Sequence, residues 1–207
     1  MVLAGLGFIG YFAWQYWGTN YVAKQKQAEI KQLIVEDWDK GIDGNAIGLL
    51  RVPRFGDDYE VPIVKGGDLL GAKGDRALAE GVAWYEPGAK PGEIGNFAVA
   101  GHRATNGEPF ATLDLVRAGD VVVAETRTRW FTYVVDRTEI VDPTATWVLD
   151  PVPGEPGATP TERLLTLTTC NPRWASTQRL IVFGHLRESR PKSDGRPAAL
   201  VRADGAA

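Results

Sequence analysis

The chain has 207 residues, of which 44% are hydrophobic and 24% charged, a size and balance that suit one globular domain with accessory segments. Its formal net charge of -3 arises from mixed signs and leaves no basic stripe, which excludes nucleic acid as a partner. A single cysteine excludes an internal disulfide, and Cys170, His102 and His185 are not spaced as the ligands of a zinc site.

Residues 1–18 form an uncharged segment whose only strongly polar side chain is Gln15. Its length is at the short limit for a membrane span. A cleaved secretory signal is the alternative, but no basic residue precedes the apolar run. We therefore predict an uncleaved transmembrane signal anchor over 1–18. Aromatic residues gather at its downstream end, as they do where a membrane helix meets the interface: Trp14, Tyr16 and Trp17.

Residues 19–45 are predicted to form a stalk or linker helix, because 21–39 are rich in Lys, Gln, Glu and Ala with sparse apolar positions. From about Ile47 the sequence changes to short β-type runs, which suggest a closed barrel or a sandwich. We expect helical turns near 69–85 and 110–116. About seven strands are expected, at 46–52, 60–64, 96–100, 120–127, 130–141, 164–170 and 179–186.

A long connection, residues 142–160, precedes the last two strands and holds five of the 13 prolines. Connections of this length in compact domains are usually functional or disordered. Trp147, Val148 and Leu149 give it an apolar patch that a disordered segment would not need, so we interpret it as a substrate-gripping loop. A solvent-exposed excursion is the alternative. Residues 188–207, with Pro, Gly, Ala and mixed charges, are predicted to be a disordered tail.

The runs 164–170 and 179–186, with turn-forming residues between them, predict an antiparallel hairpin. In such a hairpin Cys170, the last residue of the first strand, lies near Arg179, the first residue of the second. A nearby cation favours the thiolate, which is the nucleophilic form of cysteine. A lone cysteine is often only a small buried hydrophobic residue. The end of a strand at the mouth of a loop suits a nucleophile better.

Two histidines compete for the role of base to this thiol. His185 lies six residues beyond Arg179 on the same strand. At about 3.3 Å per residue that is roughly 20 Å from the start of the strand. His102 instead follows the apolar run 97–100 at a strand-to-loop junction, where an imidazole can stand at the rim of a barrel. We therefore predict that His102 is the general acid and base.

The expected chemistry pairs a thiol, with an unperturbed pKa of about 8.5, with an imidazole whose pKa is near 6.5. The thiolate–imidazolium pair is then the minor form and the reactive one. Arg179 favours the thiolate but disfavours the imidazolium, so the net population stays open. Its donors can alternatively hold a substrate carbonyl or a developing oxyanion.

These residues resemble those of the sortases, the membrane-anchored cysteine transpeptidases of Gram-positive bacteria. The likeness covers roughly residues 47–187 and rests on three elements in order. They are Gly101 and His102 after a strand, TLTTC at 166–170, which matches the family pattern TLxTC, and Arg179 nine positions beyond the cysteine. The stretches FAVAGHR, WVLDPVPG and LLTLTTCNPRWASTQRLIVFGHL are most similar to class E sortases of actinobacteria.

The resemblance implies a mainly β fold, a closed eight-stranded sortase-type barrel over 46–187 with short helices. It implies cleavage of an LAXTG- or LPXTG-type sorting signal between Thr and Gly, with Cys170 as the nucleophile, His102 as general acid and base, and Arg179 positioning substrate or oxyanion. Thr169 would line the substrate groove, and the loop 142–160 would correspond to the family's substrate-recognition loop. No metal and no cofactor is expected.

The implied partners are surface proteins with a C-terminal sorting signal, a peptidoglycan precursor or other amine as acceptor, and the membrane. The catalytic domain is expected outside the cell. Taken literally, the positive-inside rule would place it in the cytoplasm, because Lys24, Lys26 and Lys31 follow the anchor, but long domains can cross regardless of charge. Two alternatives stay open: an enzyme that joins pilins through a Lys side chain, and a non-catalytic surface β-module with an inert buried cysteine.

Overall fold

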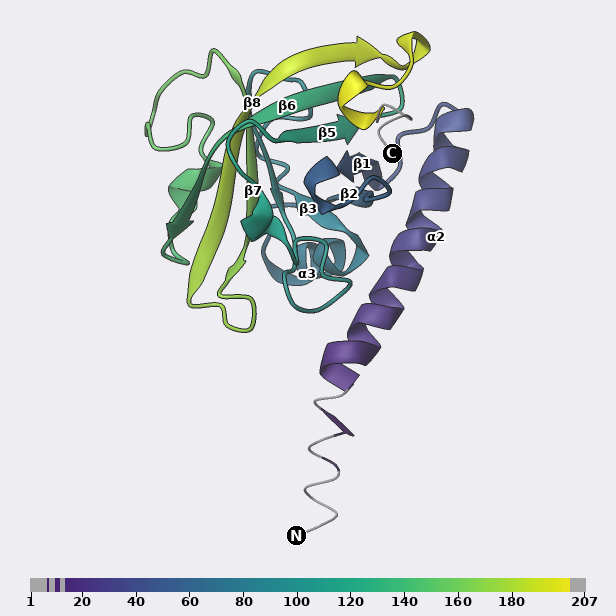
Figure 1. Ribbon diagram of the computed structural model, residues 1–207, viewed down its shortest axis with the longest axis vertical. Coiled ribbons are helices and arrows are strands. Elements are labelled where there is room, and N and C mark those ends of the chain that lie inside the picture. The colour runs from purple at the N-terminus through teal and green to yellow at the C-terminus, as the bar shows by residue number, and fades with distance from the viewer. Residues whose placement is uncertain (1–6, 8–9, 12–13, 202–207) are drawn as a thin grey trace, which may run out of the picture.

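In the computed structural model, which describes residues 7, 10, 11 and 14–201, eight strands close into a barrel in the order β1-β2-β3-β4-β7-β8-β6-β5 (Figure 1). The mainly β fold and the closed eight-stranded barrel are thereby confirmed. The strands are β1 (Ala46–Arg51), β2 (Val61–Lys65), β3 (Val82–Trp84), β4 (Gly95–Ala100), β5 (Val121–Glu125), β6 (Arg129–Val141), β7 (Arg163–Asn171) and β8 (Gln178–Pro191). The helices α2 (Thr19–Asp39) and α3 (Gly71–Glu80) accompany them.

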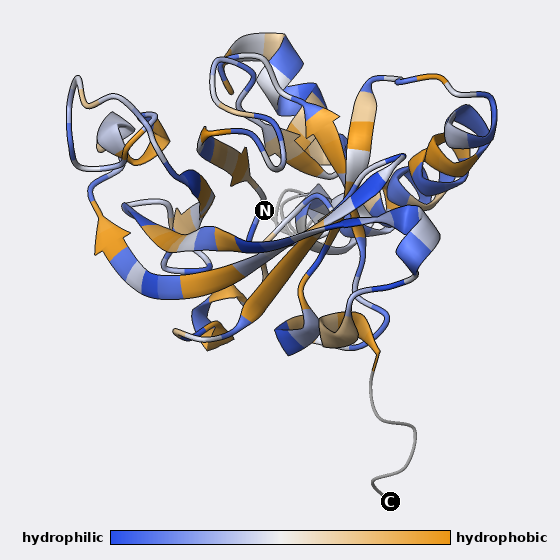
Figure 2. Cartoon of the chain, turned by 90° about the horizontal axis from the view of Figure 1, so that it is seen from above, coloured by the Kyte–Doolittle hydropathy of each residue, from blue (hydrophilic) through white to orange (hydrophobic). Residues whose placement is uncertain are grey.

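The period-two alternation of the strands fills the barrel with apolar side chains. Phe97 and Val99 of β4 and Leu165 and Leu167 of β7 are fully buried in the central cluster. Burial of each such side chain contributes about 2 kcal/mol to folding. Figure 2 shows hydrophobic residues concentrated on the strands, with mostly hydrophilic residues in the loops. The core therefore holds the strand ends in place, and the chemistry can sit at a rim.

Strand β7 lies between two partners that bring distant parts of the sequence to one end of the barrel. It pairs with β8 as an antiparallel hairpin in which Cys170 lies opposite Arg179, as predicted. It also pairs in parallel with β4, where Ala100 lies opposite Thr168. Because parallel neighbours run in the same direction, the residues that follow β4 emerge beside the end of β7.

Helix α2 is helical as predicted, but it lies against the barrel instead of standing away from it (Figure 1). Its buried side chains are Ala23 and Ile34. Two ion pairs add to this packing, Lys26 to Glu80 at 2.8 Å and Lys31 to Glu60 at 3.2 Å. The sparse apolar positions of this segment predicted a free stalk, but they are enough to pack one face of the helix against the barrel.

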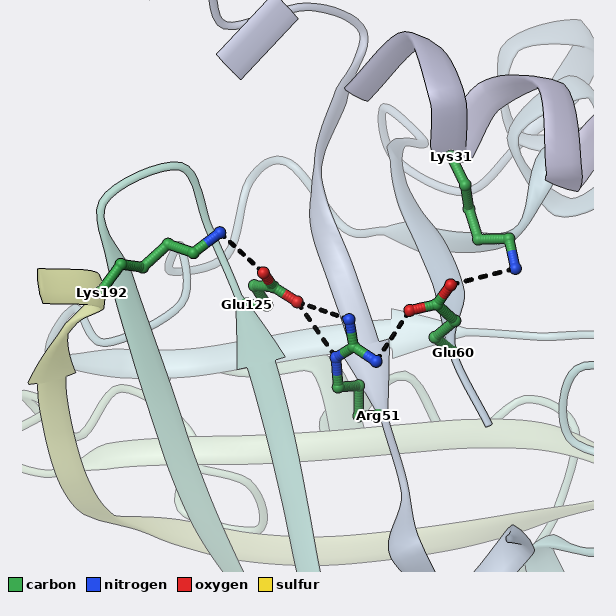
Figure 3. A network of polar contacts seen from close by, with 5 residues as sticks. All are labelled: Lys31, Arg51, Glu60, Glu125 and Lys192. Carbon is green, nitrogen blue, oxygen red and sulfur yellow. Dashed lines mark hydrogen bonds and ion pairs between the residues drawn. The ribbon is translucent and has the colours of Figure 1, made fainter. Parts of the chain in front are cut away.

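A charge network joins α2, the barrel and the C-terminal segment (Figure 3). Glu60 lies between Lys31 and Arg51, whose Nη1 is 2.7 Å from Oε2 of Glu60. Glu125 lies between Arg51 and Lys192, each 2.7 Å away. We call these five residues the charge network.

Three sequence expectations need correction or limits. Strand β3 lies inside the range 69–85, where only helical turns were expected. The sequence did not reveal it, because three residues are too few to show the alternation of apolar and polar side chains that indicates a strand. The tail expected to be disordered from 188 is ordered up to 200, since β8 continues along β6 to Pro191 and Lys192 joins the charge network. Part of the predicted anchor, 1–18, lies outside the described residues, and across those described no helix has the length and apolar character to cross a membrane.

Candidate active site

Cys170 stands at the end of β7 and shares a pocket of about 400 Å³ with His102. It is a free, half-buried thiol. Other residues of the pocket come from the loop after β7, among them Arg173 and Trp174, and from the N-terminal segment, Tyr11 and Gln15. The structure thus brings together the predicted nucleophile and the predicted base, which are 68 positions apart in the sequence. A larger pocket of about 760 Å³ lies around Arg51 and Asp57 and includes neither.

His102 is placed by the turn that leaves β4. Its backbone carbonyl accepts a hydrogen bond from the Phe110 N–H at 3.0 Å. Gly101 allows this turn because a Cβ there would lie 2.7 Å from the Phe110 ring. Burial of the imidazole lowers the pKa of His102, and the carboxylate of Asp75 opposes the shift more weakly. The ring is therefore held largely neutral, in the form that can accept a proton near neutral pH.

Arg179 lies directly opposite Cys170 in the β7–β8 register. Its Nη1 donates to the backbone carbonyls of Ser176 at 3.0 Å and Gln178 at 2.9 Å. The guanidinium therefore braces the loop that closes the hairpin. The register places Arg179 opposite the nucleophile as predicted, while its guanidinium is turned to the loop and does not line the pocket of Cys170 and His102.

Arg103 is a part of the site that the sequence analysis missed. Only 6% of it is exposed, and its Nη1 donates to Asn171 Oδ1 at 2.6 Å and to the Cys170 carbonyl at 3.4 Å. Its Nη2 lies 3.0 Å from a carboxylate oxygen of Asp114. Arg103 thus ties the segment of His102 to the end of β7. Its position directly after His102 was the feature of the sequence that could have indicated a role for Arg103 in the site.

Thr169 has a different contact from the one expected. It is 3% exposed, and its hydroxyl donates to the Gly101 carbonyl at 2.7 Å. Because neighbouring side chains of a strand point to opposite faces, Thr169 points away from the face of Cys170. It supports the turn before His102 from below and is not among the residues that line the pocket.

The apolar patch of the 142–160 loop packs on the outside of the barrel. Trp147, Val148 and Leu149 lie in a short 3-10 helix, Thr146–Leu149, and cluster with Ile181 and Phe183 of β8. The Trp147 ring stacks on Phe183 with centroids 6.0 Å apart. None of the three lines the pocket that holds Cys170. Their packing against β8 accounts for the apolar patch from which a substrate contact was predicted.

His185 lies opposite Leu164, at the other end of β7 from Cys170. Its Nδ1 is 2.8 Å from a carboxylate oxygen of Asp136, and both side chains are close to half exposed. Within the described part of the chain, no group of three or more His, Cys, Asp or Glu side chains is placed to hold a metal ion.

The arrangement at the pocket supports nucleophilic catalysis with proton transfer. A thiol and a largely neutral imidazole share the pocket at the ends of β4 and β7, and Arg103 and Arg173 also line it. Arg179 lies opposite Cys170 in the register of β7 and β8. The thiol can attack an acyl carbon, the imidazole can move a proton, and a cation can stabilise the oxyanion that forms.

Comparison with known proteins agrees with this arrangement. Residues 50–187 match the family model of the sortase domain. The chain is 34% identical to sortase SrtE1 of Streptomyces coelicolor over 97% of its own length, and it spans 59% of the length of that relative.

Two solved structures are similar over most of the chain. Sortase E from Streptomyces avermitilis is 40% identical, with a TM-score of 0.66 over 76% of this chain and 97% of the other. Sortase E1 from Streptomyces coelicolor, solved with a tripeptide in the active site, is 38% identical, with a TM-score of 0.66 over 77% and 98%.

Proposed function

The chain belongs to the sortase family, and on that premise we propose that it is a cysteine transpeptidase that uses Cys170, His102 and Arg179. The observation that carries the proposal is the shared pocket of Cys170 and His102, because it unites a nucleophile and a base at one rim of the barrel. The position of Arg179 opposite Cys170 supports its role beside the thiol.

The proposed reaction has two steps. His102 takes the proton of the Cys170 thiol as the sulfur attacks the carbonyl carbon of the signal's Thr. His102 then gives that proton to the leaving amine as the Thr–Gly C–N bond breaks. The Thr acyl group then forms a thioester with Cys170. In the second step an acceptor amine attacks the thioester, His102 takes a proton from that amine, and the C–S bond breaks. His102 then returns the proton to the sulfur, which restores the Cys170 thiol and the neutral imidazole. Arg179 stabilises the oxyanion in both steps.

We propose an LAXTG- or LPXTG-type signal as the substrate and an amine of a cell-wall precursor as the acceptor. The tripeptide bound in the active site of a similar sortase E1 supports a peptide as the substrate. Proteins that carry this signal at the C-terminus would be the substrate partners.

The test is a cleavage assay of the full-length chain in detergent with LAXTG and LPXTG peptides, with and without a glycine-based amine. Chromatography should show release of the fragment that begins with Gly, and a new amide product when the amine is present. An unchanged mixture with both peptides would contradict the proposal. Heat-inactivated protein is the control for peptide breakdown.

We also propose that residues 1–18 attach the chain to the membrane and that the catalytic domain lies outside the cell. The uncharged sequence supports this, together with Trp14 and Trp17, which are 61% and 76% exposed. Alkaline carbonate extraction of cells that express the chain should leave it in the membrane pellet, and added protease should degrade the domain on intact spheroplasts. Release by carbonate would contradict attachment through an inserted segment.

A further inference from the structure

We propose that helix α2 is a positioning element of the active site, because its Asn20 holds a turn at residues 106–108 that carries a hydrogen-bond partner of His102. The inference rests on the proposed function, since it takes His102 as the base. It adds two positioning residues, Asn20 and Asn106, neither of which belongs to the predicted catalytic set.

The turn adopts a conformation that a chain avoids unless it is held. Asn106, Gly107 and Glu108 have φ values of 52°, 82° and 51°, all in the left-handed region. For Asn and Glu this region costs free energy, and such residues persist where surrounding contacts fix them. Gly107 suits this turn because its φ of 82° is one that glycine adopts without strain, and the side-chain amide of Gln27 on α2 packs closely against it.

The contacts that fix the turn come from α2. Oδ1 of Asn20 accepts a hydrogen bond from the Gly107 N–H at 2.9 Å, and Nδ2 of Asn20 donates to the carboxylate of Glu108. One side chain therefore holds two neighbouring residues of the turn. Gln27, two helical turns further on, donates to the Asn106 carbonyl at 3.5 Å.

The turn at residues 106–108 also contacts both sides of the pocket. Nδ2 of Asn106 lies 3.1 Å from Nε2 of His102. The carboxylate of Glu108 accepts a hydrogen bond from Arg173, which lines the pocket in the loop after Cys170. A continuous set of contacts therefore runs from Asn20 to the base on one side and to the loop of the nucleophile on the other.

The amide of Asn106 suits a base that changes its protonation state. As a donor to Nε2 it keeps the neutral imidazole with its proton on Nδ1. When Nε2 takes a proton, the amide can turn and accept from it with Oδ1. A carboxylate in the same place would instead hold the imidazolium and oppose its return to the neutral form.

The experiment uses the full-length chain in detergent and compares Asn20→Ala with Gln25→Ala. Gln25 is the matched control because it lies on the same helix and its amide donates to Tyr21, away from the turn. Peptide cleavage gives kcat and KM, and long-range ¹H–¹⁵N spectra resolve the ring nitrogens of the chain's two histidines.

For Asn20→Ala we expect kcat to fall about tenfold with KM changed less, because the base is misplaced while the peptide still binds. The ring nitrogen signals of His102 should move, and those of His185 should not. Gln25→Ala should match wild type in every readout. A folded Asn20→Ala protein with the kcat and the His102 signals of wild type would overturn the inference.

Asn106→Ala keeps the test decisive if Asn20→Ala does not fold. It should lower kcat to a similar extent, and the double variant should be no slower than the slower single variant, because both act through one contact. Wild-type kcat in Asn106→Ala would also overturn the inference. A wild-type chain that cleaves no peptide, yet shows the shift of His102 signals in Asn20→Ala, would instead refute the proposed function and support the positioning contact.

Discussion

The charge network and the active site both join segments that are far apart in the sequence, but they treat their polar groups in opposite ways. In the network each carboxylate lies between two cations, and the Arg51 and Glu125 side chains are only 14% and 7% exposed (Figure 3). In the active site His102 contacts a neutral amide, and Arg179 directs Nη1 to backbone carbonyls.

This difference indicates that the charge network contributes mainly to the stability of the barrel and the active site mainly to its chemistry. Removal of Arg51 leaves Glu60 and Glu125 with one cation each instead of two, and Glu125 is poorly solvated, so the network should govern the free energy of unfolding. A base that contacts a neutral group can gain and lose a proton without breaking an ion pair, so the pocket should govern the rate. The two regions should therefore respond to mutation independently.

The largest expected effect is the loss of activity in Cys170→Ala. Cleavage of the sorting peptide should be abolished, because no other cysteine exists in the chain. The midpoint of thermal unfolding should change little, since the thiol is only half-buried at a rim. Chromatographic assay and calorimetry measure the two quantities. Peptide cleavage at the wild-type rate would place the nucleophile elsewhere.

Loss of the proposed base or cation should reduce activity without abolishing it. His102→Ala should lower kcat by about 10²- to 10⁴-fold, and Arg179→Ala by about 10²-fold. His185→Ala is the matched control, because His185 pairs with the other end of β7 and should leave kcat unchanged. Equal losses in His102→Ala and His185→Ala, with both proteins folded, would mean that the choice of base is wrong.

Arg51→Met should show the reverse pattern. The variant leaves Glu60 and Glu125 without their shared cation and should lower the free energy of unfolding by about 2–4 kcal/mol. Cleavage per folded molecule should stay at the wild-type rate. Urea unfolding and the peptide assay check both.

A surface ion pair supplies the control for Arg51→Met. Lys40 and Glu36 are 3.7 Å apart and each side chain is 62% exposed. Lys40→Met should therefore cost about 0.5 kcal/mol or less. Parallel losses of stability and kcat in Arg51→Met would show that the two regions are coupled.

A smaller effect is expected in the pH dependence of stability. Burial places the pKa of His102 below 6.5, so the folded state binds fewer protons than the unfolded state in the window beneath that value. The free energy of unfolding should therefore decrease as the pH falls below 6.5 and reach a constant offset below the folded pKa. His102→Gln should lose stability less steeply over this window in urea titrations. An identical slope in both proteins would show that His102 is not buried as a neutral group.

The hairpin of Cys170 and Arg179 could be predicted because its strands are neighbours in the sequence and their pairing follows from one turn. The approach of His102 could not be derived in that way, since it depends on the parallel pairing of β4 with β7 across a long connection. Elimination of His185 and the family resemblance pointed to it instead.

Other parts of the site could not be predicted from the sequence, because the type of a side chain does not determine which distant residue it contacts. The patch around Trp147 was predicted to contact substrate, and its packing partner in the structure, Phe183, could not be inferred from the sequence. Helix α2 docks on the barrel through few buried residues, of which Ile34 is one. Its sequence therefore indicated a free stalk. The contact of Asn20 with the turn joins positions 87 residues apart, which no local pattern reveals.

The most direct test of the account is intact-mass spectrometry of the full-length chain mixed with an LAXTG peptide, beside Cys170→Ala. We predict a mass gain equal to the peptide up to its Thr, absent from Cys170→Ala and discharged by an added amine, because the acyl group is held as a thioester on Cys170. No adduct on the wild-type chain with either the LAXTG or the LPXTG peptide, or an adduct that persists in Cys170→Ala, would contradict it.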